Sequence, residues 1–127
     1  MANNYLRQAN TVANFGIDIL VDANVDGGIP VADNALGVML PKGAVIRGAI
    51  LRNMKNDLTG TGAATVQVKV GGTALGTAAT AISAIKGKSA VVALDTPVVL
   101  TKDSEVSLNV AVGALTAGTL DIILLYV

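Results

Sequence analysis

The chain has 127 residues, nine basic and nine acidic side chains, and no net charge at neutral pH, and its length suits a single domain. It contains no Cys and no His, which excludes disulfides, thiolate metal sites and the commonest general base. The charges are scattered singly along the chain, so no basic patch favours a nucleic acid or an anionic membrane as a partner.

Charged residues make up 14% of the chain, against about 25% in ordinary globular domains. A small monomer has more surface than so few charges would normally cover. One interpretation is that other subunits cover part of this surface. The alternative is a monomer coated with Ala and Thr.

Residues 1–14 are rich in Asn, poor in large apolar groups, and lack the apolar run of a signal peptide. They are either a frayed terminus or a polar arm that extends over a neighbouring subunit, with Tyr5 and Leu6 as its anchor. We therefore divide the chain into an N-terminal arm, 1–14, and one domain, 15–127.

Three segments alternate apolar and polar residues with period two, which predicts half-buried strands with one wet face. They are 15–22, 65–70 and 105–112. In the third segment, the apolar face is expected to include Val112.

Two further segments, 44–51 and 120–127, are apolar on both faces. We expect a second sheet to bury one side of each, and a loop or a neighbouring subunit to bury the other. The run 120–127 is far too short to cross a bilayer as a helix.

Shorter apolar runs occur at 36–40, 90–94 and 98–100, and Pro97 places the last at a sheet edge or a strand start. Gly-rich and Asp-rich turn signals separate the runs. The pattern predicts an all-β fold, a β-sandwich of eight or nine short antiparallel strands that is jelly-roll-like. Residues 77–86 would also suit one or two helical turns.

The sharpest local pattern resembles the start of a calcium-binding loop, with Asp22, Asn24 and Asp26 at alternate positions, Gly27 at the sixth and Asp33 at the twelfth. However, the flanks read as strands, whereas an EF-hand requires helices. The alternative is a polar turn in which Asp, Asn and Gly supply the geometry. We assign no metal and no cofactor on this pattern.

Paired carboxylates alone can support glycoside hydrolysis. The acidic residues here fall mostly in turns, and the chain has no Trp, two Tyr and one Phe to build a sugar platform. We therefore do not expect an enzyme.

Arg47 and Arg52 lie along one apolar strand. Simple alternation places Arg47 on the face of Leu51, and Arg52 on the face of Ile46 and Ile50. An Arg among apolar neighbours is either an interface ion pair or an exposed stem packed over them.

Two motifs, a proline and small turn before an apolar strand, and a strand, Gly turn and strand ending in Tyr, resemble small β-sandwich virion proteins of tailed bacteriophages. These include head decoration (cement) proteins and jelly-roll modules of fibres. The resemblance spans about residues 36–127, and its motifs lie at 40–50, 62–72, 108–113, 117–121 and 125–127.

This resemblance implies a structural protein of the virion, a cement subunit made in the host bacterial cytoplasm and placed on the capsid surface. Its partners would be the major capsid protein and copies of itself, as a trimer. A tail or fibre module is the alternative within the same class. From a different class, a β-sandwich that binds a host glycan or protein, with or without calcium, also stays open.

Overall fold

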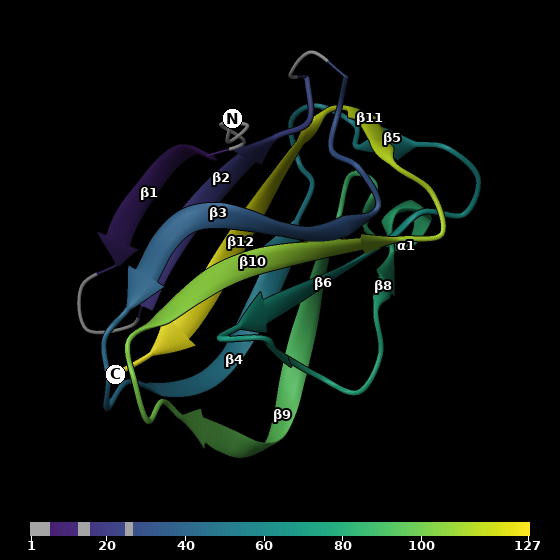
Figure 1. Cartoon of the computed structure of the whole chain (residues 1–127). Helices are drawn as coiled ribbons and strands as arrows, with labels where there is room; N and C mark the ends of the chain where they lie inside the picture. The colour runs from purple at the N-terminus through teal and green to yellow at the C-terminus, as the bar shows by residue number, and fades with distance from the viewer. Residues whose placement is uncertain (1–5, 13–15, 25–26) are drawn as a thin grey trace.

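The computed structural model describes residues 6–12, 16–24 and 27–127, and these form strands with one short helix (Figure 1). Eight strands have six residues or more: β1 (Leu6–Val12), β2 (Gly16–Asp22), β3 (Ala32–Leu40), β4 (Val45–Arg52), β6 (Thr65–Val70), β9 (Ser89–Val99), β10 (Ser104–Ala111) and β12 (Thr119–Tyr126). The shorter elements are β5 (Thr59–Gly60), β7 (Thr73–Ala74), β8 (Thr80–Ala81), α1 (Ile82–Ile85) and β11 (Leu115–Ala117).

The strands form two main sheets and one small one. The first sheet has the order β1-β2-β12-β4-β9, and the second has the order β3-β10-β6-β7, with β8 also pairing with β6. The small sheet joins β5 and β11. Every ladder between these strands is antiparallel. In Figure 1 the second sheet crosses in front of the first.

The order of connections is that of a jelly roll. With β1 set aside, the chain passes from one sheet to the other between β2 and β3, β3 and β4, β4 and β6, β8 and β9, β9 and β10, and β10 and β12. This winding produces two four-stranded antiparallel layers built from Greek keys. The predicted all-β jelly-roll sandwich is confirmed.

The core lies between the two sheets and follows from the alternation of the strands. In β10, Val106 and Leu108 are fully buried, and in β12 so are Leu120, Ile122 and Leu124. The intervening residues of both strands are half-buried or exposed. A strand that alternates in this way has one face against the core and one face outside it.

Three local features differ from simple alternation. Val112 is 73% exposed, so its predicted place on the apolar face is wrong; β10 ends at Ala111, and the positive φ of Val112 (70°) turns the chain away. The run 90–94 and the first two residues of the run 98–100 belong to one edge strand, β9, which includes Pro97 and ends one residue before Leu100. Within the segment 77–86, the helix α1 has four residues.

Candidate functional site

The calcium-like loop is tied into the fold by its own side chains. Asp22 is buried, and its Oδ1 accepts a hydrogen bond from the backbone N–H of Asn24 at 2.8 Å. The Oδ1 of Asn24 accepts one from the N–H of Gly118 at 3.0 Å. The first contact is that of an Asx turn, and the second ties the loop to the segment between β11 and β12. Asp26 lies outside the described residues.

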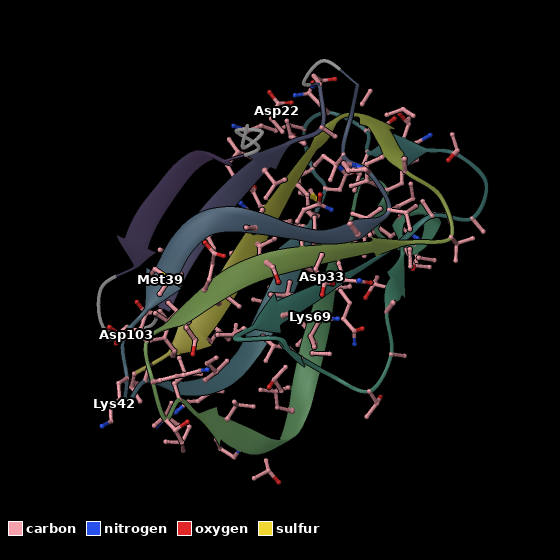
Figure 2. The ribbon with its side chains drawn as sticks, in the orientation of Figure 1. Asp22, Asp33, Met39, Lys42, Lys69 and Asp103 are labelled. Atoms are coloured by element: carbon pink, nitrogen blue, oxygen red, sulfur yellow. The ribbon has the colours of Figure 1, made fainter. Side chains whose placement is uncertain are left out.

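Asp33, the fourth candidate ligand, is placed elsewhere. It lies on β3 in the second sheet, well apart from Asp22 (Figure 2). Its carboxylate accepts hydrogen bonds from Asn109 Nδ2 at 2.6 Å and from Lys69 Nζ at 3.2 Å. These two donors hold the pKa of Asp33 below its ordinary value. The structure therefore does not bring Asp33 together with Asp22 and Asn24.

Within the described ranges, no three acidic side chains gather closely enough to hold a metal ion. In the same part of the chain, no helix is long and apolar enough to cross a membrane.

Of the four predicted interface residues, Tyr5 lies outside the described residues, and Leu6 is the first residue of β1. Thus residues 6–12, part of the predicted arm, pair with β2 at the edge of the first sheet. Arg52 forms an ion pair with Asp121 on β12, with 3.4 Å between Nη2 and Oδ2. Arg47 is exposed on β4.

The expected sharing of a face by Arg47 and Leu51 is wrong, because Leu51 is buried and Arg47 is exposed. On β12, Leu125 pairs with Gly48 and Tyr126 pairs with Ile46, so Arg47 is an extra residue on β4, and the pairing of β4 with β9 is irregular at the same place. Such a bulge shifts the alternation by one residue. Ile46 is therefore buried on the inside, whereas Arg52 and Ile50 lie on the outside of the first sheet.

A pocket of about 180 Å³ lies on this outer face. Its lining residues come from β2, β4, β12 and the segment after β4: Asp18, Leu20, Arg52, Met54, Lys55, Thr119 and Asp121. The register explains the grouping, since Leu20 pairs with Asp121 and Asp121 pairs with Arg52 across the sheet. Paired residues on neighbouring strands point to the same face.

Asp18 is the electrostatically unusual residue of the pocket. Its Oδ1 is buried and accepts no hydrogen bond from any residue that the structure describes. Burial raises the pKa of Asp18, the negative charge of Asp121 raises it further, and the positive charge of Arg52 offsets part of the rise. An ionised carboxylate in this position lacks a donor that it would have in water.

The outer faces of the two sheets differ in chemistry. On the second sheet the outward positions are mostly polar: Asp33, Thr65, Gln67, Lys69, Glu105, Ser107 and Asn109. On the first sheet one cross-strand row runs from Asp18 through Ile123 and Ile50 to Val91. Val91 is 74% exposed. Outside the charged residues of the pocket, the first sheet therefore has more large apolar side chains on its outer face, whereas the second sheet has one, Met39, among the described positions.

The sequence predicts Asp18 on the wet face of its strand and assigns it no role. The signal was the alternation of 15–22, which marks Asp18 as outward. Its neighbours Asp121 and Arg52 come from strands far along the chain, and pattern alone does not reveal which strands pair.

No protein-family model matches the sequence, and a comparison with curated proteins finds no match either. Among solved structures, the fold is similar to a chain of the capsid of Ralstonia phage GP4, with a TM-score of 0.53 and 21% sequence identity. The similarity covers 95% of this chain and 90% of that chain. At this identity the likeness establishes a shared fold over nearly the whole length of both.

Proposed function

We propose that the chain is a structural protein of a bacteriophage virion, a decoration or cement subunit that binds between capsid subunits and stabilises the assembled head. The observation that carries this proposal is the jelly-roll fold shared with a phage capsid chain over 95% of the present chain. The shortage of charge, 14% of residues, also supports extensive contact with other subunits.

The mechanism is mass action. A protein that binds the assembled lattice, and binds free capsid subunits weakly or not at all, stabilises the lattice by its binding free energy. In this role the chain carries out no chemical reaction and needs no cofactor. What it needs is a rigid framework with a large outer surface, which a β-sandwich supplies.

The direct test is immunogold labelling of intact virions of the phage that encodes the chain, with antibody raised against the purified protein. We expect label over the head. Label confined to the tail would show that the chain is a tail or fibre module. Virions that carry no label and do not contain this protein would overturn the proposal. A phage with the gene deleted provides the control for antibody specificity.

We further propose a homo-oligomer, a trimer with a mass near three times 12.7 kDa. Light scattering after size exclusion measures this mass. Deleting residues 1–14 removes strand β1 and bares the edge of β2, whereas deleting residues 1–5 leaves β1 in place. If an arm ties subunits together, both truncations should reduce the number of subunits in the oligomer. A monomeric mass for the full chain would contradict the trimer.

A further inference from the structure

The two outer faces of the sandwich suggest which one binds the lattice. The second sheet presents an ion pair of Asp33 and Lys69, joined by Asn109 (Figure 2). These polar groups satisfy one another and suit contact with water. The first sheet presents half-buried Ile50, Ile123 and Leu125 and exposed Val91, apolar surface typical of an interface core.

Within the apolar face, the pocket has an uneven charge arrangement. Arg52 Nη2 lies 3.4 Å from Asp121 Oδ2, so Arg52 forms its ion pair with Asp121 and acts on Asp18 only through its charge. Asp18 remains, with a buried Oδ1 that receives no hydrogen bond from the described residues. The pocket has apolar walls in Leu20 and Met54, and Met54 is 58% exposed.

The side chain of Asp18 lines the open pocket beside the apolar walls, and a carboxylate in that setting is complementary to one kind of side chain. A lysine or arginine places its charged head on a carboxylate and its methylene stem along apolar surface. A buried polar atom without a hydrogen-bond partner is expected mainly at a functional site. In the isolated chain, Asp18 Oδ1 is such an atom among the described residues.

We propose that the outer face of the first sheet docks onto the capsid shell, and that Asp18 there accepts a hydrogen bond from a lysine or arginine of a shell subunit. This inference rests on the proposed role as a decoration protein. Ile50, Ile123 and Val91 supply the apolar contact beside the ion pair, and the outer face of the second sheet stays toward solvent.

The test measures binding of purified variants to expanded capsids that lack the protein, by co-sedimentation. Asp18→Asn keeps the shape of the side chain and removes its charge, and Asp33→Asn makes the same change on the opposite outer face. We expect Asp18→Asn to weaken binding by roughly tenfold or more, and Asp33→Asn to bind as the parent does.

A second pair of variants tests the apolar surface without touching the carboxylate. Val91→Lys places a charge on the first sheet, and Met39→Lys places one on β3 of the second sheet, where Met39 is 58% exposed (Figure 2). We expect only Val91→Lys to weaken binding. Melting curves of all four variants test whether each is folded, and their solution masses report the oligomeric state.

The outcomes separate this inference from the proposed function. If the parent binds capsids and Asp18→Asn and Val91→Lys bind equally well, the docking face is wrong and the decoration role stands. If the two variants break up an oligomer of the free chain and leave capsid binding of the subunit unchanged, a second copy covers this face and the inference fails. If the parent itself does not bind, the decoration role fails.

Discussion

The side-chain amide of Asn53 donates a hydrogen bond to the backbone carbonyl of Thr119 at 2.6 Å, joining the end of β4 to the start of β12. The same amide donates to the carbonyl of Asn56 at 2.7 Å, and the Oδ1 of Asn53 accepts from the N–H of Leu58 at 3.0 Å. Asn53 is 1% exposed. One buried side chain thus satisfies three backbone groups of the connection beside the pocket.

Asn53→Ala should therefore destabilise the protein, because it leaves buried backbone groups without partners. We expect a loss of about 2–3 kcal/mol in the free energy of unfolding, measured by urea denaturation. Asn56→Ala is the matched control, since that residue is exposed and contributes its backbone carbonyl. Equal stability of the two variants would show that the Asn53 network contributes little.

Gly118 links β11 to β12 and has a φ of 97°. A Cβ at this position would lie 2.2 Å from the backbone oxygen of Asp57, a contact that backbone must move to relieve. We expect Gly118→Ala to cost about 3 kcal/mol or more. Urea unfolding curves of the parent and the variant measure this cost.

Gly72→Ala is the control for backbone strain, because Gly72 has a φ of 82° and open space around its Cβ position. We expect it to cost about 1 kcal/mol. A cost for Gly118→Ala no greater than this would mean that the segment at Asp57 moves aside freely.

Asp18 should make the stability of the free chain depend on pH. Its pKa is raised above the ordinary 3.8, chiefly by burial, so the folded state binds the proton more tightly than the unfolded state. This contribution lowers stability as the pH rises through the raised pKa. We expect Asp18→Asn to raise the Tm at neutral pH, and the difference from the parent to close as the pH falls below 3.8.

Asp33→Asn should have the opposite sign. Hydrogen bonds from Asn109 and Lys69 lower the pKa of Asp33, so its contribution is present above the ordinary pKa of 3.8 and is lost as the pH falls through the lowered value. The variant should therefore have a lower Tm than the parent at neutral pH. Thermal melts from pH 7 to pH 2 follow both variants together, and a shift of Asp18→Asn in the same direction would contradict the account.

Calcium binding at residues 22–33 can be tested by thermal melting. A site that used Asp22 and Asp33 together would require Asp33 to leave Asn109 and Lys69, so we expect no such site. Melting curves with added calcium and with a chelator should coincide. A higher Tm in calcium, abolished in Asp22→Asn, would show that the loop binds the ion.

Much of the fold follows from the sequence, because alternation in a strand reflects directly which face meets the core. Period two identifies the segments 65–70 and 105–112 as strands, and their alternate residues Val66, Val68, Val106 and Leu108 are all buried. The jelly-roll class followed from many short strands and frequent turns. The exception, Val112, lies where a positive φ ends the strand, which alternation does not encode.

The pocket was beyond prediction for a different reason. Asp18, Arg52 and Asp121 are separated by long stretches of chain and meet through the order β2-β12-β4. Strand order depends on which strands pair, and each strand carries the same kind of pattern. The bulge at Arg47 also moves that residue off its expected face, and Gly48 beside it is the one signal in the sequence that marks the bulge.

The most direct test of the central claim is co-sedimentation of the purified chain with expanded capsids assembled without it, followed by heating of the complex. We predict saturable binding and a higher temperature of capsid disassembly, because a ligand of the lattice stabilises it. No binding at micromolar concentration, or binding that leaves the disassembly temperature unchanged, would contradict a decoration role.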